Sequence, residues 1–260
     1  NADPVDLWEL GSGSSVLSSM ARSKGVTHHA PIDYRYGWHF GRQADQMMIL
    51  FAVLCIGVNT IFASPSCSAW GNHTRNLAPH LLEQKRTAEI PGLTFLAVVC
   101  LIQILLGRQY LLENSAYSDI FTQSPLQHLR SMVYHLAMLD QCAVGGKIGT
   151  EFIRKRSHFQ GNTSNDILNV SCPGGHTHLA LRGYQRAASA ARYPDQECER
   201  ILAQCQRHQG VAEGGSIDFS DVSVNFDDRL CLISSAFRQL HQIAIQKNLD
   251  KQWQAIMTPW

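Results

Sequence analysis

Apolar positions in the first half of the chain fall into short runs, each followed by a turn of small or polar residues. One run covers residues 5–10, a second covers 59–63, and a third covers 109–113. Short apolar runs that end at turn residues predict buried strands. We therefore expect three strands here, each of which delivers a turn at its carboxyl end.

Between these strands the apolar spacing changes to that of helices, over residues 16–21, 43–58 and 93–106. The two most apolar stretches, 47–58 and 93–106, are shorter than the ~20 residues that cross a bilayer, so we expect buried helices and no membrane partner. Residues 71–91 carry Gly, Pro and several charges, which predicts a mobile loop or a short helix between loops. Strands that alternate with helices predict an α/β fold with a doubly wound parallel sheet.

The second half of the chain is less regular. Residues 132–141 predict a helix that leads into a strand, and residues 154–160 predict another short strand. Residues 187–206 predict a helix with Cys198 and Cys205 on one face. We expect three segments: a core at 1–165, a Gly-, Cys- and His-containing segment with a helix at 166–215, and an acidic linker with a C-terminal helix at 216–260.

The composition fits a large folded domain and excludes a disordered chain. Of the 260 residues, 45% are hydrophobic and 17% are charged, which is enough apolar material for a full core. The 22 basic and 21 acidic residues nearly cancel, so a nucleic-acid surface must be a local patch. Arg154-Lys155-Arg156 is the densest such patch, and its simpler interpretation is a solvated turn.

Eight cysteines are spread along the chain, several of them inside apolar helical runs where a disulfide framework is not expected. We therefore expect reduced thiols and an intracellular protein. Three Asn-x-Ser/Thr matches, at Asn72, Asn162 and Asn169, are too short a pattern to indicate secretion. The chain begins without Met and without a signal peptide, so we expect a processed or excised domain.

Candidate functional residues follow each predicted strand. The turn Gly11-Ser12-Gly13-Ser14-Ser15 opens a helix, whose N-terminus presents free N–H groups to a ligand. Asp33 lies about 20 residues beyond this turn, where nucleotide-binding folds place a carboxylate for ribose hydroxyls. Cys67 and Glu113 follow the next two strands. Because ligands of parallel sheets sit at the carboxyl ends of strands, we expect these features to share one site.

Each feature also has a simpler interpretation. A Gly/Ser turn commonly just connects elements, and Asp33 can cap a loop. Cys67 can be a buried small hydrophobe, as free cysteines often are. The shared position at strand ends favours the functional interpretation.

The order of these motifs resembles the S-adenosylmethionine-dependent DNA (cytosine-5) methyltransferases, and also methyltransferase-like domains within retroelement polyproteins. Glu9-Leu10-Gly11-Ser12-Gly13-Ser14-Ser15 is similar to the family's Leu-Phe-x-Gly-x-Gly motif, with Gly13 on the first glycine and Ser15 replacing the second. Pro65-Ser66-Cys67-Ser68 resembles the Pro-Pro-Cys-Gln loop, with Cys67 on the nucleophile. Glu113-Asn114-Ser115 resembles Glu-Asn-Val.

A fourth motif completes the resemblance, which covers residues 5–160. Residues 139–145, followed by Arg154-Lys155-Arg156, resemble the family's late Tyr-Gly…Gln-x-Arg-x-Arg motif. The chain departs from the family at Ser66 and Ser68, and no long target-recognition segment follows Arg156. These departures leave open an inactive domain of this fold that serves as a nucleic-acid-binding or assembly module.

The resemblance implies a Rossmann-like methyltransferase of intracellular, nuclear location that transfers a methyl group to cytosine carbon 5 of nucleic acid, with DNA favoured over RNA as the substrate. Cys67 would add to carbon 6 as a thiolate, and Glu113 would act as an acid near ring nitrogen 3. Arg154 and Arg156 would hold the flipped base or its phosphates. The implied contacts to S-adenosylmethionine are Glu9, Gly11, Ser12, Gly13, Ser15 and Asp33.

A second group of candidate residues lies outside that resemblance. Cys172, His176 and His178 are good zinc ligands when they are close together, and a fourth ligand would come from Cys142, Cys198 or Cys205. Their spacing matches no standard zinc finger. The alternative is a Gly-rich turn in which the histidines are merely polar.

Overall fold

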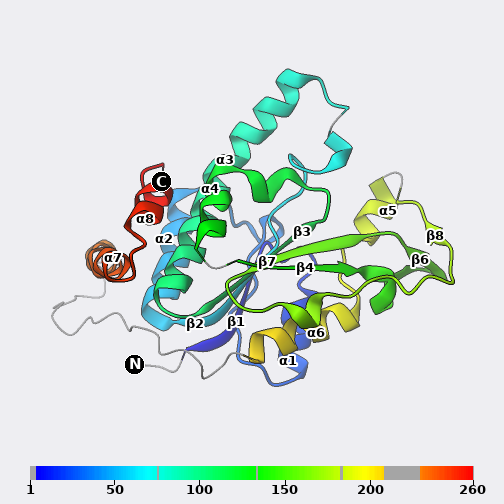
Figure 1. Ribbon diagram of the computed structural model, residues 1–260, viewed down its shortest axis with the longest axis horizontal. Coiled ribbons are helices and arrows are strands. Elements are labelled where there is room, and N and C mark those ends of the chain that lie inside the picture. Colours follow the sequence, from blue (N-terminus) through cyan, green and yellow to red (C-terminus); the bar gives the residue numbers. More distant parts are fainter. Residues whose placement is uncertain (1–3, 75, 133, 182–183, 208–228, 260) are drawn as a thin grey trace.

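A mixed sheet of five strands forms the centre of the molecule (Figure 1): β1 (Val5–Leu10), β2 (Val58–Ala63), β3 (Gln109–Ser115), β7 (Arg156–Gly161) and β4 (His135–Asp140), in this spatial order. The computed structural model describes the chain except residues 1–3, 75, 133, 182–183, 208–228 and 260. β1, β2 and β3 are parallel neighbours, whereas β7 runs antiparallel to both β3 and β4.

The prediction of an α/β fold is confirmed, but that of a wholly parallel sheet is wrong. β4 and β7 are joined by residues 141–155, which hold a 3-10 turn and the antiparallel pair β5 (Lys147–Ile148) and β6 (Glu151–Ile153). Parallel neighbours need a long crossover connection, usually a helix, and this segment has none, so β7 returns antiparallel. β8 (His178–Leu179) pairs with β6 and completes a second, three-stranded sheet.

Helices cover both faces of the central sheet (Figure 1). Alternate residues of β3 point to opposite faces, so Tyr110 and Leu112 pack against one helical layer and Leu111 packs against the other. The first layer consists of α2 (Gln43–Phe51), α3 (Pro79–Leu105), α4 (Ser124–Gln127), α7 (Arg229–Gln246) and α8 (Asp250–Met257). The second consists of α1 (Val16–Ser23) and α6 (Asp195–Gln206).

The C-terminal helices therefore pack on the same sheet as the first 165 residues. α6 belongs in sequence to the expected segment 166–215, yet it packs against α1 and β1. α7 and α8, from the expected segment 216–260, contact α3. The acidic linker expected at the start of that last segment lies largely outside the described residues.

α3 differs from the expectation of a loop or short helix at residues 71–91. The helix begins at Pro79 and continues through Pro91, although an internal proline removes one helical hydrogen bond. Its N-terminal part projects from the body, and its apolar C-terminal part is buried (Figure 1). By length and composition alone α3 is able to cross a membrane, and 72% of its most apolar stretch is buried inside the protein.

The single helix expected at residues 187–206 is broken. α5 (Tyr184–Ser189) ends early, and α6 begins at Asp195 with Pro194 as its N-cap residue. A residue that precedes a proline is disfavoured in the α conformation, so Tyr193 lies in the non-helical segment between α5 and α6. Both cysteines of α6 are buried, as the predicted shared face requires. The short turns of the chain are η1 (Tyr34–Tyr36), the π-helical η2 (Ala52–Ile56), η3 (Asn72–Thr74), η4 (Asp119–Thr122), η5 (His128–Ser131), η6 (Gln141–Val144) and η7 (Asp166–Leu168).

Candidate active site

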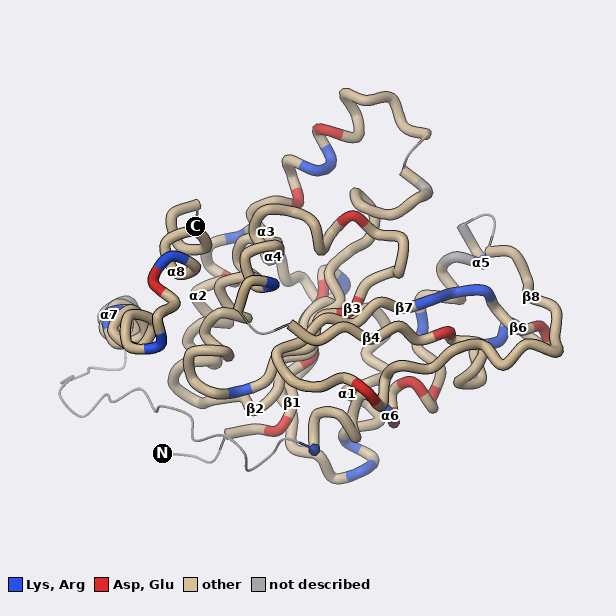
Figure 2. The backbone as a smooth tube through the Cα atoms, viewed as in Figure 1, with Lys and Arg blue, Asp and Glu red and all other residues tan. Residues whose placement is uncertain are grey.

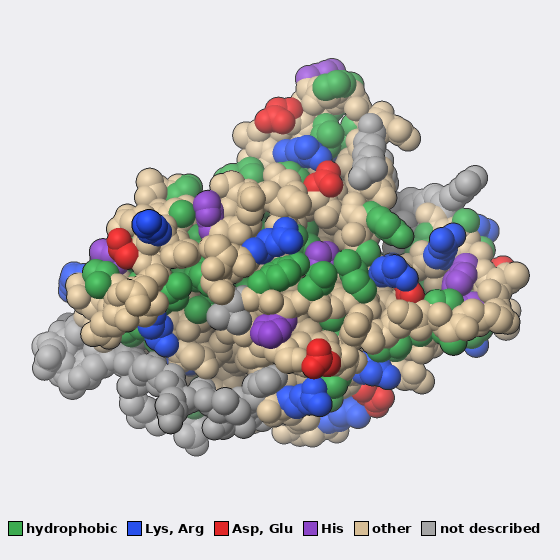
Figure 3. Space-filling view, viewed as in Figure 1, with side chains coloured by type: hydrophobic (Ala, Val, Ile, Leu, Met, Phe, Trp, Pro, Cys, Tyr) green, Lys and Arg blue, Asp and Glu red, His purple; other side chains and the backbone are tan. Residues whose placement is uncertain are grey.

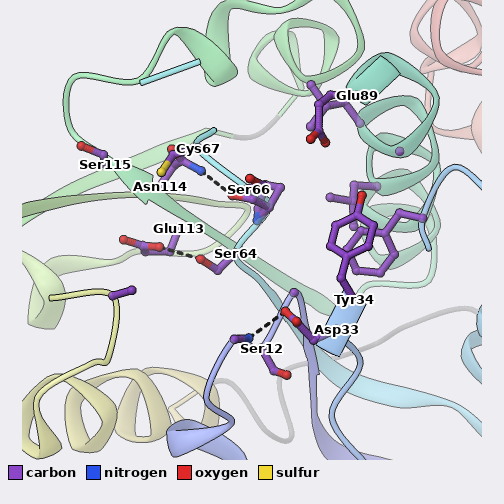
Figure 4. Close-up of a pocket in the computed structure, with 18 of the residues that line it drawn as sticks. Ser12, Asp33, Tyr34, Ser64, Ser66, Cys67, Glu89, Glu113, Asn114 and Ser115 are labelled. Atoms are coloured by element: carbon purple, nitrogen blue, oxygen red, sulfur yellow. Dashed lines mark hydrogen bonds between the residues drawn. The ribbon is translucent and has the colours of Figure 1, made fainter. Parts of the chain in front are cut away.

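A cavity of about 420 Å³ opens at the carboxyl ends of β1, β2 and β3 (Figure 4). It is bounded by the turn after β1, the loop after β2 and the end of β3. The residues that matter for chemistry on its wall are Gly11, Ser12, Gly13, Asp33, Ser64, Cys67, Glu113, Asn114, Lys155 and Tyr193. The structure thus brings the predicted glycine turn, Asp33, Cys67 and Glu113 to one cavity.

The glycine turn is packed against the loop after β2. Gly11 has φ +71°, and a Cβ atom added to it would lie 2.5 Å from the carbonyl oxygen of Ser64. Only a residue without a side chain fits such an approach. The Gly13 N–H donates to Asp33 Oδ2 at 2.8 Å, while the Arg35 N–H donates to Asp33 Oδ1 at 2.9 Å. Asp33 therefore fixes the turn through its hydrogen bonds and also lines the cavity.

Two residues expected at the cofactor lie outside the lining of the cavity. Glu9 is buried and points to α1, where its carboxylate accepts hydrogen bonds from the backbone and side chain of Ser18. Burial raises the pKa of Glu9 to about 7. Ser15 is also buried, and its hydroxyl lies 2.8 Å from the Tyr36 hydroxyl and 3.1 Å from that of Ser12. Both residues hold the turn in place from the side that faces away from the cavity.

The loop that carries Cys67 is fixed by two consecutive residues of β3. Ser64 Oγ donates to Glu113 Oε2 at 2.8 Å, and Asn114 Nδ2 donates to the carbonyl of Pro65 at 2.7 Å. Successive strand residues point to opposite faces, so Glu113 and Asn114 hydrogen-bond to the loop from opposite faces of the sheet. Cys67 itself is exposed at the apex of the loop (Figure 4).

Opposing effects act on the pKa of Cys67. Packing around the thiol raises this pKa through desolvation, while the Lys155 ammonium lowers it and the Glu113 carboxylate raises it further. Lys155 lies between the two arginines in the chain, and its effect is smaller than that of desolvation.

The arginines expected at the base or its phosphates lie on a neighbouring cavity of about 590 Å³. Arg156 forms a two-pronged ion pair with Asp140, at 2.6 and 2.8 Å, which neutralises its charge. Arg154 is exposed, and Tyr117, at 60% exposure, stands on the same cavity. Lys155 lines both cavities, so the basic segment leading into β7 connects them (Figure 2).

Comparisons with known proteins give no family assignment. A scan against protein-family models finds no match, and a search of curated proteins finds no significant relative. What the site does must therefore be argued from its own geometry.

Four side chains at the far end of β4 form a cluster that could bind a metal ion. The ligand atoms of Cys142, Cys172, His176 and His178 all lie within 4.8 Å of one another. The two histidine Nε2 atoms are 3.1 Å apart, and each is 3.6 Å from the Cys172 sulfur. The fourth member is Cys142, whereas Cys198 and Cys205 lie in the core on α6.

The cluster joins the two sheets of the molecule. Cys142 follows β4, and His178 begins β8 in the small sheet. Asp140 Oδ2 accepts the N–H of Cys172 at 2.8 Å, so the residue that pairs with Arg156 also orients a member of the cluster. Histidine and basic side chains lie side by side on this part of the surface (Figure 3).

Sequence reasoning missed four residues of the site. Ser64, Asn114, Lys155 and Tyr193 act on Cys67 or Glu113. Asn114 and Lys155 lay within the quoted motifs without an assigned role. Ser64 adjoins the Pro-Ser-Cys turn, and no local signal identified Tyr193.

Proposed function

We propose that the protein is a Rossmann-like methyltransferase that transfers a methyl group from S-adenosylmethionine to carbon 5 of cytosine in nucleic acid. The observation that carries the proposal is the convergence of Cys67 and Glu113 on one cavity beside the Gly11–Gly13 turn. Three parallel strands whose loops share one ligand site support the fold assignment.

The walls of the cavity fit a nucleoside cofactor. At Gly13 nothing lies within 4 Å of the place an added Cβ atom would take, so the turn is open to a ligand there, and Phe40, Leu93 and Leu96 supply an apolar wall for a base. Each Asp33 oxygen accepts one backbone N–H, which leaves further acceptor positions for ribose hydroxyls. The bound cofactor would supply the electrophilic methyl group.

The chain's own residues would activate the cytosine. The Cys67 thiolate would add to carbon 6 of the cytosine and make carbon 5 nucleophilic, and the cofactor would supply the methyl group to carbon 5 and leave as its demethylated thioether. Glu113 would stabilise the ring by donating a proton or hydrogen bond at nitrogen 3. Loss of the carbon 5 proton to solvent, with return of any nitrogen 3 proton to Glu113, would then restore the ring double bond, break the bond between Cys67 and carbon 6 and free the thiolate. Lys155 stabilises the thiolate before the addition.

Transfer of labelled methyl to DNA and RNA tests this proposal. Wild-type protein should label cytosine-containing oligonucleotides, and Cys67→Ser should label none. Cys55→Ser is the matched control, because Cys55 lies in η2 outside the cavity lining. Wild-type protein that binds the cofactor but labels neither DNA nor RNA would contradict the proposal.

One observation favours a second candidate function. Desolvation raises the pKa of Cys67, which opposes formation of the thiolate that a nucleophile requires. This fits an inactive domain that retains the cavity and the basic segment at residues 154–156 as a nucleic-acid-binding or assembly module. Nucleic-acid binding without methyl transfer would select this function.

We also propose that the four-residue cluster binds zinc as a structural ion. Two thiolates and two imidazoles are a typical closed ligand set for tetrahedral zinc. Metal analysis should find about one zinc per chain, because structural sites bind tightly. Cys142→Ser should lose the metal and melt at lower temperature, whereas Cys198→Ser should retain it. Metal-free wild-type protein of unchanged stability after chelation would contradict this proposal.

Location and partner follow from the same proposals. Seven cysteines have described side chains, and none of these forms a disulfide, which supports a reducing, intracellular environment. A DNA substrate would place the protein in the nucleus.

A further inference from the structure

We infer that Tyr193 is a positioning residue for Glu113, which it holds in the orientation required for protonation of the substrate ring. The inference rests on the proposed function. Tyr193 Oη donates to Glu113 Oε2 at 2.8 Å in the buried wall of the cavity. The two residues are 80 positions apart in the chain, and the break between α5 and α6 brings them together.

The Tyr193 ring is itself held rigidly. It packs edge-on against Phe62 of β2, with ring centroids 6.0 Å apart, and the Lys155 ammonium lies 5.7 Å from its centroid. Pro194 restricts the backbone on its C-terminal side. Burial and the neighbouring Glu113 carboxylate raise the pKa of Tyr193 well above its usual value, so the hydroxyl remains a donor at neutral pH.

Both hydrogen bonds to Glu113 reach the same oxygen. Ser64 Oγ and Tyr193 Oη both donate to Oε2, while Oε1 is buried and has no hydrogen-bond partner among the described residues. Two donors on one oxygen fix the rotation of the carboxyl group.

A second carboxyl group, that of Glu197, lies near Tyr193 and Glu113 but carries little negative charge. Glu197, on the first turn of α6, is fully buried, and burial raises its pKa to about 8. At neutral pH this carboxyl group is therefore largely uncharged. Glu197, which acts electrostatically on both Tyr193 and Glu113, therefore adds little negative charge beside the Glu113 carboxyl group.

The test compares two tyrosine-to-phenylalanine variants in full-length protein. Tyr193→Phe removes the hydroxyl and keeps the ring. Tyr110→Phe is the matched control, because Tyr110 is also buried but packs into the opposite layer. We expect Tyr193→Phe to slow single-turnover methyl transfer roughly tenfold, with cofactor affinity within about twofold of wild type, since a buried hydrogen bond that orients Glu113 is lost. Tyr110→Phe should react at the wild-type rate.

A double-mutant cycle separates positioning from a general structural role. In a Glu113→Gln background, Tyr193→Phe should cause no further loss of rate, because its effect acts through Glu113. An additive loss in that background, or a wild-type rate for Tyr193→Phe, would overturn this inference alone. Absence of methyl transfer by the wild-type protein would overturn the proposed function, and this inference with it.

Discussion

Asn114 Nδ2 donates to the carbonyl oxygen of Pro65 at 2.7 Å and thereby ties the loop that carries Cys67 to the end of β3. The Asn114 side chain is buried, and its acceptor precedes Cys67 by two residues. The geometry of the thiol therefore depends on a neighbouring strand as well as on its own turn.

Asn114→Ala should loosen this loop. The buried Pro65 carbonyl loses its donor, so we expect the free energy of unfolding to fall by about 1–3 kcal/mol. Alkylation of Cys67, followed by mass spectrometry, should become faster as the loop opens. Asn59→Ala is the control, because Asn59 lies on β2 and its amide reaches Asp6 instead. Unchanged alkylation in Asn114→Ala would show that the loop is held by other contacts.

The glycine turn offers a pair of matched substitutions. Gly11 and Gly13 both have positive φ, at +71° and +55°, so alanine costs roughly 1–2 kcal/mol of backbone strain at either position. At Gly11 the new Cβ would also meet Ser64 O at 2.5 Å, whereas at Gly13 nothing lies within 4 Å. We expect Gly11→Ala to lower the urea midpoint clearly more than Gly13→Ala. Equal midpoints would mean that the loop after β2 moves away freely.

Glu9 makes stability depend on pH in a direction that can be worked out. Its pKa is raised from 4.5 in an unfolded chain to about 7, so the unfolded state loses its proton first, and folding loses stability as pH rises from about 4.5 to 7. The loss is on the order of 3 kcal/mol. His158, whose pKa is lowered to about 4, acts in the opposite direction between about pH 4 and 6.5.

The measurement for Glu9 is therefore a difference between two proteins. Thermal melts of wild type and Glu9→Gln across pH 5 to 8 should show Glu9→Gln gaining relative stability as pH rises. The amide oxygen of Gln still accepts a hydrogen bond from Ser18, so the helix contact is kept. Cofactor affinity should be unchanged, because Glu9 lies outside the cavity lining. A parallel pH dependence of the two proteins would contradict the raised pKa.

Local sequence patterns predicted the parts of this molecule that depend on local interactions. Apolar runs predicted the three parallel strands, and glycine predicted the turn at Gly11. The shared cavity was predicted because the carboxyl ends of parallel strands lie at the same edge of the sheet. The reversed direction of β7 depends on the length and content of the connection after β4, which periodicity does not report. The continuation of α3 through Pro91 depends on burial of the residues that follow it.

Long-range contacts explain what the sequence could not indicate at the site. Tyr193 reaches Glu113 from a break that helical periodicity concealed, and Glu9 turns away from the cavity because Ser18 offers it two donors. The metal cluster was predicted in its three close members. Its fourth, Cys142, is 30 residues before Cys172 and was one of three alternatives that only the fold could separate.

The most direct test of the account is covalent trapping of Cys67 on cytosine. With S-adenosylmethionine present, an oligonucleotide carrying 5-fluorocytosine should remain bound to the wild-type protein. Fluorine replaces the carbon 5 proton whose loss would free the enzyme, so the carbon–sulfur bond persists. Mass spectrometry should place the adduct on Cys67, and Cys67→Ser should form none while it still binds the cofactor. An adduct on another residue, or no adduct on either DNA or RNA, would contradict the assignment of Cys67 as the nucleophile.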